Sequence, residues 1–197
     1  MNTKLYVLEG PDGVGKSTLA TQLQRHLRQN GCKSELFSFP GNEPGTVGNH
    51  IYGLYHNPNS FGVQRISTIC QQLLMVAAHA DVIQRIIPAL EQDLHVILDR
   101  FWWSTWVYSS FARIDINIRE LLIKLELVLW RSYLPNCIFL IRRNRPSNSE
   151  HCIDSWRKLV LLYNEIAKLE QHRSKVIHID NNGTLEESIS HMVREIT

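Results

Sequence analysis

Short apolar runs alternate along the chain with longer amphipathic stretches. The short runs are four to six residues long and mostly apolar on both faces, as in strands buried inside a parallel sheet. They cover residues 4–8, 34–39, 95–98, 137–141 and 175–179. Five such strands separated by helices predict an α/β fold.

The first amphipathic stretch shows the 3.6-residue period of an α-helix. Leu19, Leu23 and Leu27 share one face of this helix. The pair Asn30-Gly31 then provides a favourable C-terminal cap, because glycine readily adopts the left-handed conformation required there. The pattern therefore predicts a strand, a loop and a helix in direct succession.

The same period predicts the other helices. A long one is expected over about residues 63–91, in which Pro88 predicts a kink or a stop. Thr184 and Glu187 form a capping box, in which each side chain binds a backbone N–H at the start of a final helix. The remaining helices, including that final one, are expected over residues 103–111, 116–131, 155–171 and 185–195.

Composition narrows the class of protein. Of 197 residues, 44% are hydrophobic, which is enough for a core, and 21 Lys and Arg against 19 Asp and Glu leave little net charge. We therefore expect neither a nucleic acid polymer nor a membrane as a partner. No repeat or linker divides the chain, so a single domain over residues 1–197 is expected. Four widely spaced cysteines without a CxxC pair favour a reduced, cytoplasmic setting.

One glycine-rich motif carries the strongest chemical signal. Gly10-Pro-Asp-Gly-Val-Gly15-Lys16-Ser17 satisfies the GxxxxGK[ST] pattern and lies between a predicted strand and a predicted helix. Its backbone N–H groups and the helix N-terminus would hold phosphate oxygens, with Lys16 on the β- and γ-phosphates. The predicted ligand is ATP with Mg²⁺. Its predicted binding residues are Gly10, Asp12, Gly13, Val14, Gly15, Lys16, Ser17, Thr18 and, from a later segment, Tyr108.

A second charged pair ends the third predicted strand. Asp99 and Arg100 follow an apolar run, at the edge where open α/β sheets bind ligands. Asp99 is a candidate Mg²⁺ ligand together with the hydroxyl of Ser17, and Arg100 is a candidate phosphate clamp. The alternative for this pair is a simple helix cap. Asp12, inside the loop, would repel a triphosphate unless it points toward another partner, such as an acceptor hydroxyl; a plain turn residue is the alternative.

These motifs together resemble the thymidylate kinase family of P-loop nucleoside monophosphate kinases. The stretch from Glu9 to Thr18 is similar to the family's EGxDGxGKST loop, and Glu43-Pro-Gly-Thr46 to its EPGGT segment. Asp99-Arg100-Phe101, with Ser104 and Tyr108, is similar to its DRY-x-x-S-x-x-x-Y stretch. The resemblance implies a P-loop NTPase fold with a five-stranded parallel sheet flanked by helices on both faces.

The resemblance also implies an activity, which is transfer of the ATP γ-phosphoryl group to a nucleotide 5′-phosphate, with dTMP as the default acceptor. The partner is then a small-molecule nucleotide, and a homodimer is possible. By similarity, Asp12 meets the acceptor's sugar, Arg100 its phosphate and Tyr108 its sugar or base. A lid over about residues 142–153 would add catalytic charge through Arg142, Arg143 and Arg145, with a solvated basic turn as the alternative.

Several positions depart from the family pattern. An arginine usually precedes the Glu-Pro-Gly element, whereas this chain has Asn42. The family's base-stacking ring and base-reading arginine on the long helix are missing here, where the chain has Leu74 and Ala78. His79 replaces the arginine by a one-residue shift or is simply packed or solvated. Ser109 stands where glutamine is common, and Trp102, Trp103 and Trp106 either stack a different base or pack the core.

Two alternatives to a nucleotide kinase stay open at this point. A deoxynucleoside kinase is disfavoured, because that group tends to lack the carboxylate at Asp12 and the Asp99-Arg100 pair. A nucleotide-binding regulatory or defence protein that has lost efficient transfer is favoured by the altered acceptor residues.

Overall fold

A computed structural model describes residues 4–41, 43–131, 133–147 and 152–196. Its strands are β1 (Leu5–Glu9), β2 (Ser34–Ser38), β3 (His95–Asp99), β4 (Cys137–Arg142) and β5 (Val176–Asp180). Its helices are α1 (Lys16–Gln29), α2 (Val47–His56), a 3₁₀ turn (Pro58–Phe61), α3 (Thr68–Glu91), α4 (Trp102–Phe111), α5 (Ile116–Trp130), α6 (Ile153–Glu170) and α7 (Leu185–Ile196).

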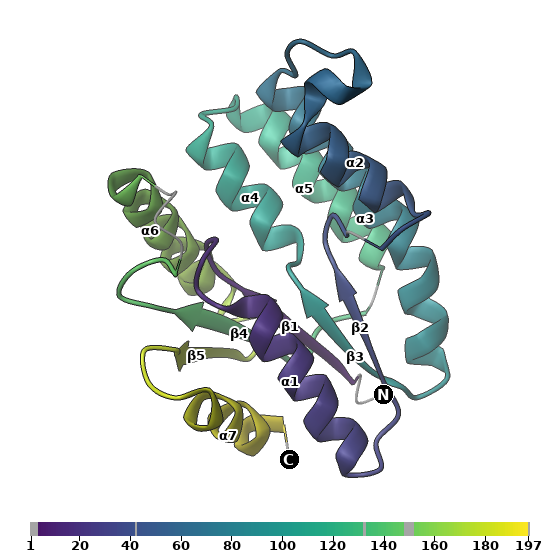
Figure 1. Ribbon diagram of the computed structural model, residues 1–197, viewed down its shortest axis with the longest axis vertical. Coiled ribbons are helices and arrows are strands. Elements are labelled where there is room, and N and C mark those ends of the chain that lie inside the picture. Colours follow the sequence, from purple (N-terminus) through teal and green to yellow (C-terminus); the bar gives the residue numbers. More distant parts are fainter. Residues whose placement is uncertain (1–3, 42, 132, 148–151, 197) are drawn as a thin grey trace.

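All five strands form one parallel sheet in the order β2-β3-β1-β4-β5. The central strand β1 places Leu8 beside Asp99 of β3 and beside Phe139 of β4. Parallel pairing aligns the carboxyl ends of all strands, so the loops after β1, β3 and β4 meet at one edge of the sheet (Figure 1). The phosphate-binding motif and the Asp99-Arg100 pair therefore lie at the same edge.

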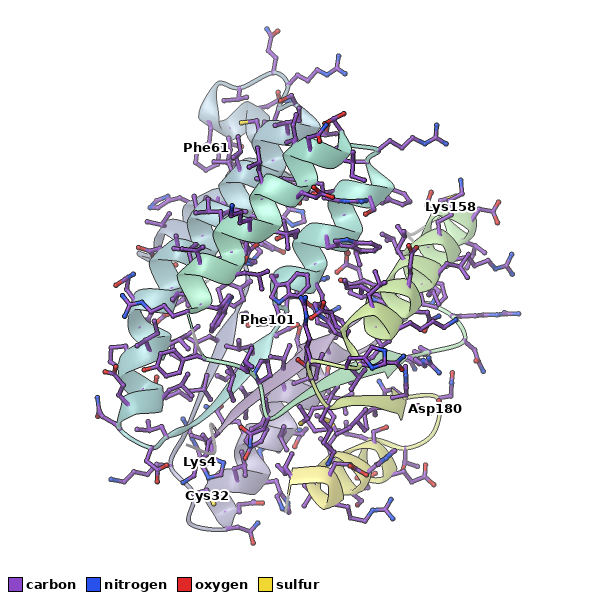
Figure 2. All side chains as sticks on the ribbon, turned by 180° about the vertical axis from the view of Figure 1, so that it is seen from behind. Lys4, Cys32, Phe61, Phe101, Lys158 and Asp180 are labelled. Carbon is purple, nitrogen blue, oxygen red and sulfur yellow. The ribbon has the colours of Figure 1, made fainter. Side chains whose placement is uncertain are left out.

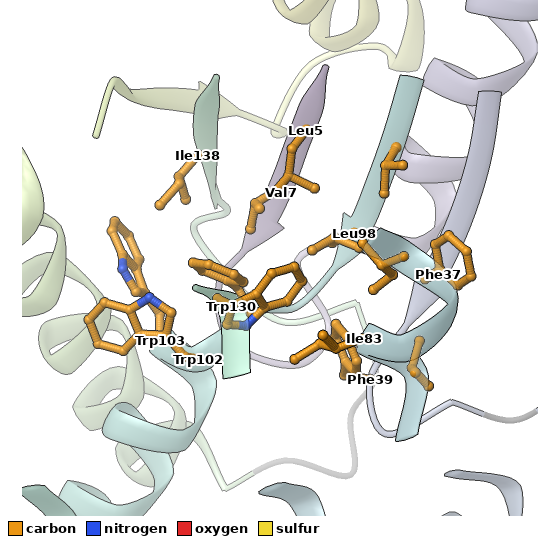
Figure 3. Packing of buried hydrophobic residues seen from close by; sticks show 14 of the residues in the cluster. Leu5, Val7, Phe37, Phe39, Ile83, Leu98, Trp102, Trp103, Trp130 and Ile138 are labelled. Atoms are coloured by element: carbon orange, nitrogen blue, oxygen red, sulfur yellow. The ribbon is translucent and has the colours of Figure 1, made fainter. Parts of the chain in front are cut away.

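Alternate residues of each strand enter two separate cores. Leu5 and Val7 of β1 face the layer of α3, α4, α5 and α6, whereas Tyr6 and Leu8 face α1 and α7. Figure 3 shows the first core, where Trp130 lies between the strand residues and the helix residues. The period-2 alternation of strand side chains explains why both faces of these short runs are apolar.

The predicted strands are confirmed to within one residue at each end. Helices α1, α4, α5, α6 and α7 are confirmed to within two residues of the predicted bounds wherever both ends were predicted. Asn30-Gly31 ends α1 as expected, with Gly31 at φ 78° and the Cys32 N–H bonded to the Leu27 carbonyl. The capping box at Thr184 and Glu187 is also formed.

The long helix ends at Glu91 as predicted, but its start was predicted wrongly, and Pro88 does not stop it. It starts at Thr68 rather than near residue 63, because Ser67 caps it through the Cys70 N–H. It also continues through Pro88 to Glu91, so the proline neither stops the helix nor marks its end. By length and composition α3 resembles a membrane-crossing helix, yet its Ile83 and Ile86 lie buried in the core against the sheet.

The sequence pattern gave no indication of α2. This helix begins after Thr46, whose hydroxyl accepts the Asn49 N–H. Gly48 lets it approach the loop after β2, because a Cβ at that position would lie 1.9 Å from the Pro40 carbonyl oxygen. Helix α2 is short and exposes Tyr52 and Tyr55, so its apolar periodicity is weak.

We predict that Thr184→Ala destabilises the protein by about 1 kcal/mol, because it leaves the first N–H groups of α7 without their hydroxyl partner. Thr184→Ser keeps the hydroxyl and serves as the matched control. Chemical denaturation of both variants measures the difference, and equal stability of the two would contradict the role of this cap.

Candidate active site

The loop between β1 and α1 has the backbone that phosphate binding requires. Gly10 and Gly15 adopt φ 144° and 93°, which side chains other than glycine rarely tolerate. A Cβ at Gly10 would lie 2.7 Å from the Ile141 carbonyl oxygen, and one at Gly15 would lie 2.5 Å from the Asn181 amide nitrogen. The loop is thus closely packed against the ends of β4 and β5, and Asn181 also donates to the Val14 carbonyl at 2.7 Å.

Lys16 is buried at the start of α1, where its ammonium group donates to the Pro11 carbonyl at 2.8 Å. Burial and, to a smaller extent, the positive charge of Arg100 lower the pKa of Lys16 to about 8, although nearby carboxylates act in the opposite direction. The ammonium therefore lies in a poorly solvated position, where a phosphate would favour its charged form.

Ser17 and Asp99 meet across the loop, as the sequence predicted for a pair of magnesium ligands. The Ser17 hydroxyl donates to Asp99 Oδ2 at 2.5 Å. Asp99 Oδ1 is buried and has no hydrogen-bond partner within the described part of the chain. An unpartnered buried carboxylate oxygen beside a hydroxyl is a donor set that suits Mg²⁺, which prefers oxygen ligands.

Arg100 occupies the centre of the site. It follows β3 with φ 82°, a left-handed conformation that is uncommon for arginine. Its guanidinium forms an ion pair with Asp12 and donates to Ser104 at 3.0 Å and to the Tyr163 hydroxyl at 3.1 Å. Tyr108 also donates to Asp12, at 2.8 Å. The structure thus brings Asp12, Arg100 and Tyr108 together, and both Asp12 carboxylate oxygens accept bonds from protein.

Glu9 belongs to this cluster, although the sequence analysis assigned it no role. It is fully buried at the end of β1, and Oε1 accepts the backbone N–H groups of Phe101 (2.8 Å) and Ser104 (3.1 Å). Its Oε2 accepts the Ser104 hydroxyl at 2.9 Å. Figure 2 shows Phe101 near the middle of the molecule, between the sheet and the helices above it. Burial raises the pKa of Glu9 to about 7, although Arg100 lowers it.

A signal for Glu9 was present in the sequence. An acidic residue at the end of an apolar strand, directly before a glycine-rich loop, requires partners that satisfy its buried charge. Here those partners are the first N–H groups of α4, so Glu9 caps the helix that carries Ser104 and Tyr108.

A cavity of about 590 Å³ opens beside this cluster. Asp12, Gly13 and Arg100 line one end, which is therefore shared with the phosphate-binding loop. The remaining lining residues come from the loop after β2 and from α2, α3 and α4; they are Phe39, Pro40, Tyr52, Tyr55, His56, Gln72, Met75, His79, Ser104, Thr105 and Tyr108. The size suits a small organic ligand.

Two residues of α3 that line the cavity are one position further along the chain than Leu74 and Ala78. Met75 and His79 line the cavity, whereas Leu74 and Ala78 do not. On a helix, positions 75 and 79 lie one turn apart on the same face, so the one-residue shift considered for His79 applies to both positions. On this face of α3 a thioether and an imidazole border the cavity.

His79 has a buried partner that the sequence did not reveal. Its Nδ1 lies 2.5 Å from Glu126 Oε2 on α5, and Thr105 donates to the other oxygen of Glu126 at 2.5 Å. His79 and Glu126 are separated by 47 residues in sequence, so no local pattern connects them. Both side chains are almost fully buried.

The tryptophans pack the protein and do not line this cavity. Trp102 and Trp103 are buried in the core between the sheet and the helices, as Figure 3 shows. Trp106 packs against that core and lies under the Arg119 guanidinium, which is 5.1 Å from its ring centroid. Of the two roles weighed for these residues, packing is the one the structure supports.

The predicted lid lies on the other side of the loop. Arg142 is the last residue of β4 and donates to Asn164 of α6 at 2.9 Å, and Arg143 follows it. Both line a second cavity of about 500 Å³ with residues of β5 and α6. Arg145 is exposed in the loop beyond. Asn42 and residues 148–151 lie outside the described residues.

Two hydrogen bonds attach the lid region to the phosphate-binding loop. The Ser147 N–H donates to the Gly13 carbonyl at 2.9 Å, and the Trp156 indole of α6 donates to the Asp12 carbonyl at 2.8 Å. These bonds leave the side chain of Asp12 directed toward Arg100. The predicted lid segment and α6 therefore contact the cluster through the backbone of residues 12 and 13.

Comparisons with known proteins agree with this geometry. A family model described as thymidylate kinase matches residues 8–189. A thymidylate kinase of Chlorobium phaeobacteroides is 32% identical over 198 residues, which cover 88% of this chain and 86% of that relative. One from Chlorobaculum parvum is 34% identical over 141 residues, which cover 70% and 60%. The crystal structure of thymidylate kinase from Ehrlichia chaffeensis matches the fold with a TM-score of 0.75 at 21% identity, covering 98% of both chains.

We predict that binding of Mg·ATP weakens as the pH rises above about 8, by up to about tenfold per pH unit, because the pKa of Lys16 is about 8 in the free protein. A bound triphosphate favours the charged ammonium, so binding above this pH takes up a proton. Calorimetry in two buffers of different ionisation enthalpy measures that uptake.

Glu9 adds a separate contribution nearer to pH 7, since a bound anion also favours its protonated form. The variant Glu9→Gln removes this contribution and lowers the pKa of Lys16, because the Glu9 charge raises that pKa in the unsubstituted protein. Absence of proton uptake by Glu9→Gln at about pH 8 to 9 would contradict the assignment of Lys16.

Proposed function

The chain belongs to the thymidylate kinase family, and we propose that it transfers the γ-phosphoryl group of ATP to the 5′-phosphate of dTMP with the residues described above. The observation that carries this proposal is the shared end of the large cavity, where Asp12, Gly13 and Arg100 adjoin the phosphate-binding loop. A nucleotide in that cavity would present its phosphate to Arg100 and to a triphosphate held by Lys16.

In the proposed reaction the acceptor phosphate oxygen attacks the γ-phosphorus, and the bond to the β–γ bridging oxygen breaks. Lys16 stabilises the β- and γ-phosphates, and Arg100 holds the attacking phosphate in line. Asp12 and Ser104 fix the guanidinium of Arg100 before the substrate arrives. The predicted contact of Asp12 with the acceptor's sugar stays a prediction.

Magnesium would be held by Ser17 and Asp99, whose unpartnered Oδ1 supports this assignment. When bound, it neutralises charge on the phosphate oxygens. Arg142, Arg143 and Arg145 are proposed to approach the triphosphate from the lid side, since Arg142 and Arg143 line the cavity next to the loop. We place the protein in the cytoplasm, as the spaced cysteines suggest.

A second candidate function is nucleotide binding without efficient transfer, as in a regulatory or defence protein. Met75 and His79 favour it, because they replace the family's base-contacting ring and arginine in the cavity wall. A deoxynucleoside kinase has less support. The guanidinium of Arg100, held by Asp12, suits an anionic acceptor such as a phosphate better than the free hydroxyl of a nucleoside.

One assay separates these functions. Incubation with Mg·ATP and a panel of nucleosides and nucleoside monophosphates, with ADP release as the readout, is expected to show turnover with dTMP. Turnover with thymidine alone would favour the nucleoside kinase, and no turnover despite ATP binding would favour the regulatory protein.

Lys16→Met is predicted to abolish transfer, because the methionine offers no charge to the β- and γ-phosphates. Arg100→Ala is predicted to raise KM for dTMP and to lower kcat by at least about tenfold, because Arg100 no longer holds the acceptor phosphate in line with the γ-phosphorus. Steady-state kinetics with each substrate varied measures both effects. Unchanged turnover of Lys16→Met, or a loss of ATP affinity alone in Arg100→Ala, would contradict the proposed roles.

We also propose a homodimer formed through α5. Leu121, Leu125 and Val128 follow the i, i+4, i+7 spacing on this helix and are 66%, 46% and 64% exposed, which is unusual for an apolar stripe on a monomer. Figure 2 shows α5 on the outer surface of the helical layer. A stripe of this kind would be buried against the same stripe of a second copy.

Leu121→Glu with Val128→Glu is predicted to convert a dimer into a monomer in sedimentation velocity, because each buried charge disfavours the interface. Leu161→Glu on α6 is the matched control, since Leu161 is 67% exposed and lies away from the stripe. If the protein with both Leu121→Glu and Val128→Glu is still a dimer, the stripe on α5 is not the dimer interface.

A further inference from the structure

Helix α6 contacts both halves of the site. It begins at Ile153, directly after the predicted lid, and packs against α4. Its first turn holds the phosphate-binding loop, because the Trp156 indole donates to the Asp12 carbonyl at 2.8 Å. Two turns later, Tyr163 lies on the same face of the helix, and its hydroxyl accepts from the Arg100 guanidinium at 3.1 Å. One helix thus bonds to the loop and to the arginine of the acceptor cavity.

The Tyr163 hydroxyl makes two hydrogen bonds whose directions are fixed by its neighbours. The Ser104 hydroxyl donates its one hydrogen to the carboxylate of Glu9 at 2.9 Å. Tyr163 must then donate to Ser104, at 2.9 Å, and accept from Arg100. Tyr163 is 1% exposed, and burial raises its pKa well above the ordinary value, so the phenol keeps its hydrogen. Each of these groups therefore has one defined orientation.

The next residue of α6 holds an arginine of the other cavity. Asn164 accepts from the Arg142 guanidinium at 2.9 Å, and Arg142 lines the second cavity, beside the phosphate-binding loop. Consecutive residues of one helix, Tyr163 and Asn164, thus bond to one arginine from each cavity. A helix is a rigid element, so it fixes the positions of these two arginines relative to each other.

Tyr163 differs from the other partners of Arg100 in its position. Asp12 and Ser104 also bond to this guanidinium, and both line the acceptor cavity. Among the described residues whose side chains bond to it, Tyr163 is the one that lines the second cavity. Its hydroxyl is therefore the side-chain connection between Arg100 and the donor side of the site.

We infer that Tyr163 is a positioning residue for phosphoryl transfer, which directs the Arg100 guanidinium toward the acceptor phosphate and couples the acceptor cavity to the second cavity through α6. This inference rests on the proposed function, because it assigns a role in the same reaction. Tyr163 acts through Arg100 and does not itself touch the reacting atoms. A triphosphate that attracts Arg142 alters its bond to Asn164, and the adjacent Tyr163 transmits this change to Arg100.

The test uses Tyr163→Phe, which removes the hydroxyl and keeps the buried ring. Calorimetry measures the dissociation constant for dTMP with and without a Mg²⁺-bound ATP analogue whose β–γ bridge cannot be cleaved. The ratio of the two constants is the coupling factor between the cavities. We expect Tyr163→Phe to raise the dissociation constant by about three- to tenfold, and to bring the coupling factor toward one from about fivefold or more in the unsubstituted protein.

Tyr6→Phe is the matched control. Tyr6 is also buried, its hydroxyl bonds to His95 Nδ1 at 3.2 Å, and it lines neither cavity. This variant is expected to lose stability in chemical denaturation and to keep both the dissociation constant and the coupling factor. Tyr163→Phe combined with Arg100→Lys is expected to bind dTMP about as weakly as Arg100→Lys alone, because Tyr163 acts through the guanidinium.

Two results would overturn the inference. One is a loss of stability in Tyr163→Phe with the dissociation constant and the coupling factor unchanged, even if the protein phosphorylates dTMP. The other is a pair of effects that multiply in the double variant, since Tyr163 would then act by a route other than Arg100.

A failure of the proposed function is recognised separately. If the unsubstituted protein does not bind dTMP, the acceptor is a different molecule, and NMR measures the positioning of Arg100 directly from its side-chain N–H resonance, which is assigned with Arg100→Lys. A resonance that is sharp in Tyr6→Phe and broadened in Tyr163→Phe supports the inference. Equal resonances in the two variants overturn it.

Discussion

The site depends on one buried cluster of charge between β1 and β3. Glu9 ends one strand and Arg100 follows the other, and Ser104 connects them by accepting from Arg100 and donating to Glu9. Burying these charges is costly unless each is hydrogen-bonded, so the cluster fixes the loop, the left-handed backbone at Arg100 and the start of α4 together. Asp12 extends the cluster into the phosphate-binding loop.

This hydrogen-bonded cluster fixes the positions of the two halves of the site relative to each other. The loop that receives a triphosphate and the cavity that receives an acceptor share Asp12, Gly13 and Arg100. Their relative position is set by parallel strands in register, with Leu8 beside Asp99. Phosphoryl transfer depends mainly on positioning and on neutralising charge, so a rigid common element is what the reaction requires.

The cavity above this cluster is bordered by a buried pair of titratable side chains. His79 of α3 lines the cavity and is paired with Glu126 of α5. The buried pair is held by Thr105 and Phe39, which belong to elements that also border the phosphate end. The pair of His79 and Glu126 and the charged cluster around Arg100 are thus packed together through shared elements.

The sequence predicted the sheet, most helices and the phosphate-binding loop because each follows from local pattern. It placed Ser17 near Asp99 only through the rule that parallel strands end at one edge, and it did not predict the ion pair between Asp12 and Arg100. It missed α2, whose exposed tyrosines obscure its periodicity, and it missed Glu126, which reaches His79 across 47 residues. The shift from Leu74 and Ala78 to Met75 and His79 required the rotation of α3 about its axis, which the pattern alone does not fix.

The central claim is that Asp12 acts on the acceptor by holding Arg100. A double-mutant cycle with Asp12→Asn and Arg100→Lys, read out as the dissociation constant for dTMP, tests it most directly. The account predicts that the double variant binds dTMP about as weakly as the weaker single variant, because both substitutions disrupt the same ion pair. If the fold-increases in the dissociation constant of the two single variants multiply in the double variant, the two side chains act independently, which would contradict the account.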